Sequence, residues 1–323
     1  MPLGIPPKYT VYGVIGFAVS FCGAIKYYSR GSKYKGKKNC LGKTFIVTGA
    51  NSGIGRETAF NFAKEGGRVI LACRDMEKCA AAKKEIINFT YNVQVICKKL
   101  DLASIKSIRQ FAEEINKEET HVDVLVNNAG VMRCPETLTK DGIEMHLGVN
   151  HLGHFLLTNL LIEKLKGSVP SRVINVTCSA FVNGKINFKD LNSEDSYEEG
   201  VAYSQSKLAL MLFTRELSKK LQGTGITVNA VHPGMSKTAI MRHTRLYNSK
   251  ISSFFFWPIH FFVFKSVDRA AQTVLFAALD PSLQDVSGKY FSDCEEKEIS
   301  ENALNDEDAK RLWLTSEKWT RLT

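Results

Sequence analysis

The sequence contains no C-x-x-C pair, although it has eight cysteines in 323 residues. Paired spacings are typical of zinc sites, and dense cysteine is typical of small disulfide-stabilised proteins. Two of the seven histidines, His151 and His154, are three residues apart in a predicted helix, but no third ligand lies near them in the sequence. We therefore expect free thiols in a reducing compartment, histidines in packing or surface positions, and no metal site.

Acidic residues are absent from the first 43 positions, which hold eight basic residues. The other 280 residues carry 35 basic and 33 acidic side chains, so most of the net charge of +10 lies in the N-terminal segment. A nucleic-acid-binding domain is expected to carry a basic patch on its folded surface. The distribution of charge therefore argues against nucleic acid as a partner.

Charged residues are also absent from residues 9–25, a run of seventeen mostly apolar residues. The shortest transmembrane helices have about 17 residues. Basic residues cluster after the run rather than before it, and no Ala-x-Ala site ends the run, so a cleaved signal peptide fits less well. A short buried helix is the other alternative. We predict an N-terminal membrane-anchor helix and basic segment over 1–40, in the endoplasmic reticulum or the mitochondrial inner membrane. The domain at 41–323 is expected on the cytoplasmic or matrix side, which is the reducing side.

Internal repeats and low-complexity linkers are absent as well, which favours one domain after the anchor. Short apolar runs that are typical of buried strands alternate with longer amphipathic patterns. The predicted strands are 44–48, 68–72, 93–97, 122–126, 172–176, 227–231 and 289–291, and the predicted helices include 54–65, 76–88, 105–117, 145–165 and 202–221. This alternation predicts an α/β fold, a single Rossmann-like doubly wound parallel sheet with helices on both faces.

The first predicted strand runs into Thr-Gly-Ala-Asn-Ser-Gly-Ile-Gly, residues 48–55, directly before a predicted helix. Glycines allow a sharp turn and a close backbone approach to a pyrophosphate, whose charge the free N–H groups at the helix start attract. A structural tight turn is the alternative. The predicted cofactor-binding residues of this loop are Gly49, Ala50, Asn51, Ser52, Gly53, Ile54 and Gly55.

The end of the second predicted strand carries no acid before Arg74. A carboxylate here typically binds a free ribose 2′-hydroxyl, whereas an arginine binds a 2′-phosphate. Asp75 follows, but we expect it to cap the next helix, so we predict NADP(H) rather than NAD(H). Asp101 is a candidate contact for the adenine amino group, and Asn128 in the Asn-Asn-Ala-Gly loop is a candidate for the nucleotide crevice. Each of these two is otherwise an ordinary turn residue.

Tyr203 and Lys207 are four residues apart on a predicted helix and so share a face. A tyrosine with an ordinary pKa near 10 is a poor base at neutral pH. An adjacent ammonium is expected to lower that pKa and so to bring proton exchange with an alcohol or a carbonyl within reach. The spacing occurs by chance in many proteins, but here it follows the fifth predicted strand.

Together these motifs resemble the short-chain dehydrogenase/reductase superfamily over about residues 40–295. Further stretches, including LACRDMEKC, NNAGVMRCP, GVNHLGHFLLTNLL, VHPG and SGKYFSDC, are similar to its retinol dehydrogenase branch. The resemblance implies that Tyr203 is the proton donor and acceptor and that Lys207 holds the nicotinamide ribose. It also implies that Asn150 holds a water linking Lys207 to bulk solvent, and that Pro233 and Gly234 border the nicotinamide pocket.

The resemblance further implies that the substrate is a retinoid-like apolar alcohol or aldehyde, with retinaldehyde reduced to retinol when NADPH is abundant. A steroid or a lipid-derived aldehyde is the alternative substrate, and a nucleotide-binding protein without turnover is the alternative function. The aromatic run SFFFWPIHFFVF, residues 253–264, is expected to form a substrate lid, a bilayer contact or a buried helix pair. The membrane bilayer is thus an expected partner, and a homo-oligomer is left open.

The resemblance fails at one short stretch, the end of the fifth predicted strand. The family usually ends the fifth strand with two serines, as in Asn-Val-Ser-Ser, and the second serine polarises the substrate oxygen. This chain reads Asn-Val-Thr-Cys-Ser instead. An ungapped match places Cys178 at the second serine, and a thiol is a weak hydrogen-bond donor. Loss of one oxyanion donor costs roughly 10²–10³ in turnover. Either Cys178 is a handicapped donor, or a shift of one residue brings Ser179 to the substrate oxygen.

Overall fold

The computed structural model describes residues 30–36, 39–236, 240 and 264–322, together with four single positions before residue 24. The predicted anchor run at 9–25 therefore lies largely outside the described residues, and so does the aromatic run apart from Phe264. Within the described part of the chain, no helix is both long and apolar enough to cross a membrane. The anchor and the domain boundary at residue 40 stay predictions.

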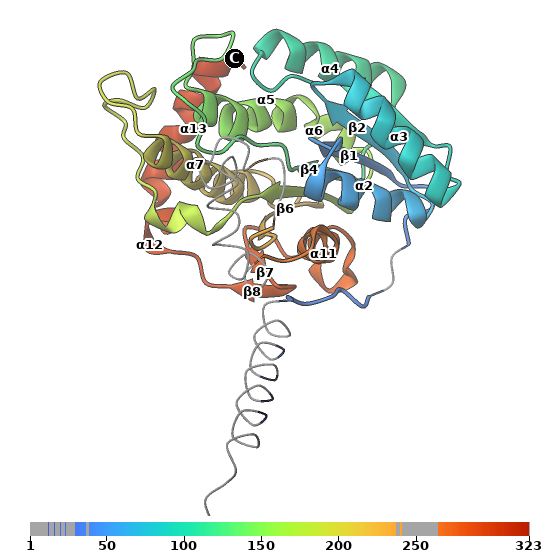
Figure 1. The fold of residues 1–323 in the computed structure, drawn as a ribbon. Coiled ribbons are helices and arrows are strands. Elements are labelled where there is room, and N and C mark those ends of the chain that lie inside the picture. The colour runs from blue at the N-terminus through green and yellow to red at the C-terminus, as the bar shows by residue number, and fades with distance from the viewer. Residues whose placement is uncertain are drawn as a thin grey trace, which may run out of the picture.

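One eight-stranded sheet forms the centre of the described chain, in the order β3-β2-β1-β4-β5-β6-β7-β8 (Figure 1). Its strands are β1 (Thr44–Thr48), β2 (Arg68–Cys73), β3 (Val95–Lys99), β4 (Val124–Asn127), β5 (Ser171–Val176), β6 (Ile226–His232), β7 (Tyr290–Ser292) and β8 (Glu295–Lys297). Neighbouring strands from β3 to β7 are parallel, and β8 pairs antiparallel with β7. The strand order reverses between β1 and β4, and the carboxyl ends of parallel strands open a crevice at such a point.

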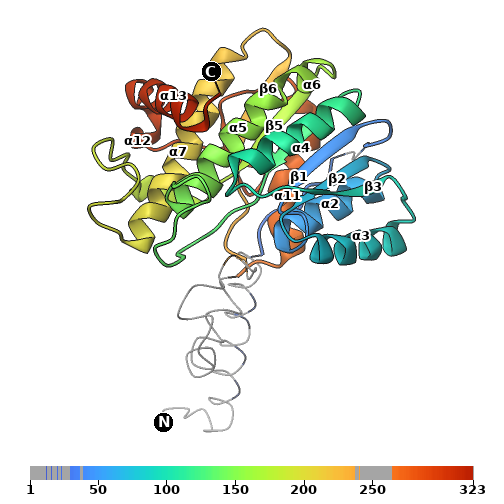
Figure 2. The same ribbon diagram turned by 90° about the horizontal axis from the view of Figure 1, so that it is seen from above.

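Helices cover both faces of the sheet. They are α2 (Gly53–Lys64), α3 (Met76–Thr90), α4 (Ile105–Glu118), the π-helix η1 (Leu147–Leu152), α5 (Gly153–Leu160), α6 (Ile162–Lys166), the 3₁₀-helix η2 (Ser179–Asn183), α7 (Glu199–Lys220), α11 (Val267–Leu279), the 3₁₀-helix η4 (Pro281–Leu283), α12 (Glu301–Leu304) and α13 (Asp306–Thr320). Figure 2 looks onto the face that α4, α5 and α7 cover, whereas α2 and α11 lie behind the sheet. The predicted α/β fold with a parallel sheet is confirmed.

The predicted helix 145–165 is wrong as one continuous helix, because η1 opens it and a non-helical residue, Leu161, separates α5 from α6. The side chain of Asn150, in the middle of η1, forms hydrogen bonds with the loop after β4 and with Ser206 of α7. Wider π-helical turns of this kind are frequent at functional sites. The local disruption therefore coincides with a residue that the family resemblance singles out.

The expectation that every cysteine is a free thiol is also wrong. Cys79 in α3 and Cys97 in β3 form a disulfide. Their separation of 18 residues carries no recognisable spacing signal, and the packing of α3 beside β3 brings them together. Cys73, Cys134, Cys178 and Cys294 are free cysteines of the described chain.

The segment after Phe291 is rich in acidic residues, yet its helices also contribute to the core. All three residues of β8 are exposed. However, α12 buries Ala303, and α13 buries Leu312 and stacks Trp313 on Phe213 of α7. The acids therefore occupy the outer face of elements that close one end of the core.

Candidate active site

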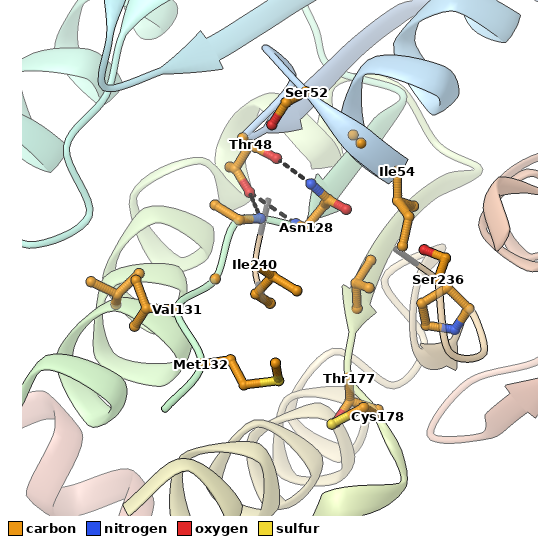
Figure 3. A pocket seen from close by; sticks show the side chains of 18 of the residues that line it. Thr48, Ser52, Ile54, Asn128, Val131, Met132, Thr177, Cys178, Ser236 and Ile240 are labelled. Carbon is orange, nitrogen blue, oxygen red and sulfur yellow. Dashed lines mark hydrogen bonds between the residues drawn. The ribbon is translucent and has the colours of Figure 1, made fainter. Parts of the chain in front are cut away.

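A cavity of about 570 Å³ lies at the carboxyl ends of the central strands, and nearly every predicted site residue lines it. The predicted residues in its wall are Gly49, Asn51, Ser52, Gly53, Ile54, Gly55, Arg74, Asp101, Asn128, Cys178, Ser179, Tyr203, Lys207, Pro233 and Gly234. Ala50 and Asn150 are fully buried behind the wall. Figure 3 shows Thr48, Ser52 and Asn128 at one end of the cavity, and Met132 and Cys178 at the other. The fold thus collects motifs that are far apart in sequence into one space.

The glycine loop between β1 and α2 is built for close backbone approach. Gly49 and Gly53 have φ values of 66° and 55°, a region that favours glycine. A Cβ on Gly55 would lie 2.5 Å from the Asn128 amide nitrogen and 2.6 Å from the Gly49 carbonyl oxygen. Ser52 precedes α2 without a side-chain cap, so the first N–H groups of the helix are available to an anion.

Thr48 joins the glycine loop to the Asn-Asn-Ala-Gly loop, a role that the sequence analysis missed. Its Oγ1 accepts hydrogen bonds from the backbone N–H groups of Asn128 and Ala129, both at 2.9 Å. The Asn128 side chain donates in return to the Thr48 carbonyl at 2.8 Å. His154 contacts Thr48 Oγ1 at 3.0 Å, and burial lowers the His154 pKa to about 4, so this histidine is a neutral packing residue as expected.

Charged side chains gather where β2 ends. Arg74 is exposed and lines the cavity. The carboxylate of Asp75 accepts from the Lys78 backbone N–H at 3.1 Å, which confirms the predicted helix cap, and it pairs with the Lys78 ammonium at 2.8 Å. Lys78 also lines the cavity and is a second cation that the sequence analysis missed. Asp101 is held by an ion pair with Lys140 at 3.1 Å.

Cys178 lies against the phenol of Tyr203. The Cys178 Sγ and Tyr203 hydroxyl atoms are 3.1 Å apart, within hydrogen-bond distance for sulfur. Ser179 is exposed and begins η2. Of the two alternatives drawn from sequence, the geometry therefore favours Cys178 as the group beside the phenol.

The pKa of Tyr203 moves in the opposite direction to the one expected. Burial is the largest cause that raises it well above its ordinary value; the interaction with Cys178 acts in the same direction, and Arg133 opposes them. The Lys207 ammonium lies 5.9 Å from the centre of the Tyr203 ring and donates to the Val176 carbonyl at 3.2 Å. Burial also lowers the pKa of Lys207. The expectation of a lowered tyrosine pKa is therefore wrong for this structure, and the phenol is held neutral.

Asn150 ties three parts of the site together. Its side-chain oxygen accepts from the Val131 N–H at 2.9 Å, and its amide donates to the Val131 carbonyl at 3.0 Å and to Ser206 Oγ at 2.9 Å. Ser206 directly precedes Lys207 on α7. Asn150 thus fixes the loop after β4 to the helix that carries the Tyr-x-x-x-Lys pair.

Metal-ligating side chains do not gather in the described residues: no group of three or more His, Cys, Asp or Glu there is arranged to hold an ion. His151, which pairs with His154 on the same predicted helix, is buried with Nε2 2.9 Å from Ser316 Oγ. Burial lowers its pKa to about 3. It is therefore a neutral packing residue.

Comparisons with known proteins agree with this geometry. The family model of the short chain dehydrogenases matches residues 43–248. Retinol dehydrogenase 13 from Mus musculus is 53% identical over 94% of this chain and 91% of its own length, and human retinol dehydrogenase 12 is 51% identical over 85% of each. An uncharacterised protein from Mycobacterium paratuberculosis has a solved structure with a TM-score of 0.71 at 35% identity, which covers 88% of this chain and 95% of that one. A complex of Pseudomonas aeruginosa RhlG with NADP in its active site has a TM-score of 0.64 at 26% identity, covering 79% and 96%. This chain belongs to the short-chain dehydrogenase family, in its retinol dehydrogenase branch.

Proposed function

We propose that this protein is an NADP(H)-dependent oxidoreductase that interconverts an apolar, retinoid-like alcohol and its aldehyde, with Tyr203 as the proton donor and acceptor. The observation that carries the proposal is the single cavity in which the glycine loop, Arg74 and the pair Tyr203 and Lys207 meet. The names of the relatives support the substrate class, and the RhlG complex supports the cofactor class.

The residues of the cavity fit a dinucleotide. The uncapped start of α2 and the close approach at Gly55 suit a diphosphate. Arg74 and Lys78 suit a ribose 2′-phosphate, since both are cations and the neighbouring Asp75 is held by the helix start. Lys207, Pro233 and Gly234 line the other end, where the nicotinamide would lie. NADPH supplies the hydride when it is bound there.

Tyr203 performs the proton transfer in this proposal. Its raised pKa keeps the phenol protonated at neutral pH, which is the state that a donor to a carbonyl oxygen needs. A substrate oxygen within reach of the phenol also meets Cys178, because the two groups are 3.1 Å apart. The thiol is a weak donor, so it polarises the oxygen less than a hydroxyl would.

The pH dependence of the two directions follows from the raised pKa of Tyr203. Carbonyl reduction uses the neutral phenol and will stay level up to roughly pH 10, the ordinary value for tyrosine. Alcohol oxidation uses the phenolate and will rise with pH across the same range. The measurement is kcat in each direction in one buffer series; a reduction rate that falls between pH 7 and 9 would contradict the neutral-phenol donor.

An apolar substrate suits the wall beside the catalytic pair. Val131, Met132, Ile240 and Phe264 line the cavity. Phe264 is the last residue of the aromatic run 253–264 and the one residue of that run that the structure describes. The roles expected for the run, as a lid, a bilayer contact or part of the core, remain proposals. Competition between all-trans-retinaldehyde, a steroid ketone and a medium-chain aldehyde on one detergent-solubilised preparation tests the substrate. The retinoid should have the highest kcat/KM; binding of NADPH without turnover of any of them would leave the binding-only alternative.

Removal of either cation that follows β2, Arg74 or Lys78, will weaken the preference for NADPH over NADH. A hydrogen bond to a charged group contributes about 1.5–3 kcal/mol, so Arg74→Ala will raise the KM for NADPH roughly tenfold or more and leave the KM for NADH unchanged. Lys78→Ala should act in the same direction. Lys84→Ala removes an exposed cation of α3 that does not line the cavity and serves as the matched control. Equal losses with both cofactors would argue against a 2′-phosphate site.

Membrane anchoring through residues 1–40 remains part of the proposal, with the domain on the reducing side of the endoplasmic reticulum or mitochondrial inner membrane. The described segment 30–36 exposes Arg30, Lys33 and Lys35 and buries Tyr34 edge-on against Phe276 of α11. The basic side chains are thus held at the surface of the catalytic domain. A homo-oligomer stays open.

A further inference from the structure

A buried acid and an imidazole lie beside Tyr203 and take no part in the reaction described above. Glu144 is 2% exposed and His146 is fully buried. The carboxylate accepts hydrogen bonds from the backbone N–H groups of His146 at 2.8 Å and Leu147 at 2.7 Å, and it faces the His146 Nδ1 atom at 2.7 Å. The Glu144 carboxyl group thus has three hydrogen-bond partners, one of which is His146 Nδ1, and these bonds fix the orientation of the imidazole ring.

The other ring nitrogen of His146 reaches the loop after β4. Nε2 accepts from the Cys134 backbone N–H at 3.3 Å and lies 3.4 Å from its Sγ. The hydroxyl of Tyr197 donates to the Cys134 carbonyl at 2.7 Å, and the Tyr197 ring stacks on the imidazole with centroids 6.5 Å apart. We call Glu144, His146, Cys134 and Tyr197 the imidazole cluster. It joins the loop after β4, the start of η1 and the approach to α7.

Each of those three segments carries a part of the proposed active site. The loop after β4 places Met132 in the cavity wall, η1 carries Asn150, and α7 carries Tyr203. The imidazole also touches the catalytic ring directly. The rings of His146 and Tyr203 meet edge to face, with centroids 5.9 Å apart and an angle of 64° between them.

We propose that Glu144 and His146 are positioning residues, which hold the Tyr203 ring and the Met132 side of the cavity in place relative to Cys178. The expected effect on kcat rests on the proposed function, whereas the expected effect on the position of the Tyr203 ring does not. Without the Glu144 carboxylate the buried ring loses the bond at Nδ1 and is free to turn away from the Cys134 backbone. The cluster therefore controls the chemical step without contacting the substrate.

The variant Glu144→Gln tests the proposal in the full-length, detergent-solubilised protein. A glutamine amide cannot accept all three donors, so one of the bonds to His146 or Leu147 is lost. Incorporation of 3-fluorotyrosine gives a ¹⁹F resonance for Tyr203, which the Tyr203→Phe variant assigns. We expect Glu144→Gln to shift that resonance and to lower kcat per NADPH-binding site about tenfold, with the KM for NADPH within about twofold.

Glu119→Gln is the matched control. Glu119 is a buried carboxylate, 6% exposed, that accepts hydrogen bonds of 2.7 and 2.8 Å from Arg68. Arg68 is the first residue of β2, so this pair lies at the amino ends of the strands, away from the cavity. Its loss should lower the thermal midpoint as much as Glu144→Gln does, and leave the Tyr203 resonance and kcat per site unchanged. A Glu144→Gln variant that behaves like this control would overturn the proposal, because the cluster would then be merely structural.

Tyr197→Phe keeps the test decisive if Glu144→Gln does not fold. It removes one hydroxyl from the cluster and leaves the carboxylate and the imidazole in place. We expect a smaller shift of the Tyr203 resonance in the same direction and a kcat roughly fivefold lower. No shift and no change in kcat would refute the proposal. If no carbonyl is reduced by the unmodified protein, the proposed function fails, and the ¹⁹F resonance still decides whether the cluster positions Tyr203.

Discussion

Replacing Tyr203 with phenylalanine will lower kcat roughly 10²–10⁴-fold, the usual contribution of a positioned general acid, and will leave NADPH binding unchanged. The phenol hydroxyl faces the cavity beside Cys178, and no other described side chain presents a hydroxyl that contacts Cys178 Sγ. The ring itself remains, so the packing against His146 is kept. Steady-state oxidation of NADPH gives kcat, and fluorescence titration of NADPH gives the dissociation constant.

Tyr290→Phe is the control for this substitution. Tyr290 is 7% exposed in β7, packs edge-on against Phe181 and does not line the cavity. Its loss should cost some stability and leave kcat within about twofold of the unmodified protein. Retained activity in Tyr203→Phe would show that another group transfers the proton.

Replacing Cys178 with serine will raise kcat for carbonyl reduction by about tenfold or more. A serine hydroxyl in the same position is a stronger donor than the thiol and would face both the Tyr203 hydroxyl and the substrate oxygen. The upper limit is roughly 10²–10³, the value of one oxyanion donor in a hydrolase. The measurement compares kcat for the two proteins at saturating NADPH.

Ser179→Ala and Cys178→Ala separate the two possible donors. Cys178→Ala should lower kcat below that of the unmodified protein, because even a weak donor is lost, while Ser179→Ala should change kcat little, since this side chain is exposed at the start of η2. A large loss in Ser179→Ala with no gain in Cys178→Ser would show that Ser179 reaches the substrate oxygen instead.

Short-range patterns predicted the parts of the site that depend on local geometry. The glycine loop, the cap at Asp75 and the pair Tyr203 and Lys207 each follow from spacing within one strand–helix junction or one helix face. The alternation of apolar runs predicted the parallel sheet, because buried strands and amphipathic helices have different periods. Strand β8 was missed, since three exposed charged residues carry no apolar signal.

The features that sequence patterns did not predict depend on contacts between different elements. Thr48 bonds residues 80 positions later, and the Cys79 and Cys97 thiols meet through the packing of α3 on β3. The Tyr203 pKa was expected in the wrong direction because a four-residue spacing says nothing about desolvation or about Cys178 beside the phenol. Each of these features depends on which elements pack together. The sequence pattern of a single strand or helix does not specify its packing partners.

The most direct test of the proposed function is reduction of all-trans-retinaldehyde by the detergent-solubilised protein with NADPH, followed by separation of the retinoids. The account predicts that retinol forms in equal amount to the NADPH consumed, at a rate that Tyr203→Phe abolishes and Cys178→Ser increases. Tight binding of NADPH with no retinol formed by either the unmodified protein or Cys178→Ser would contradict it. The cavity would then serve a different carbonyl substrate or bind the nucleotide without turnover.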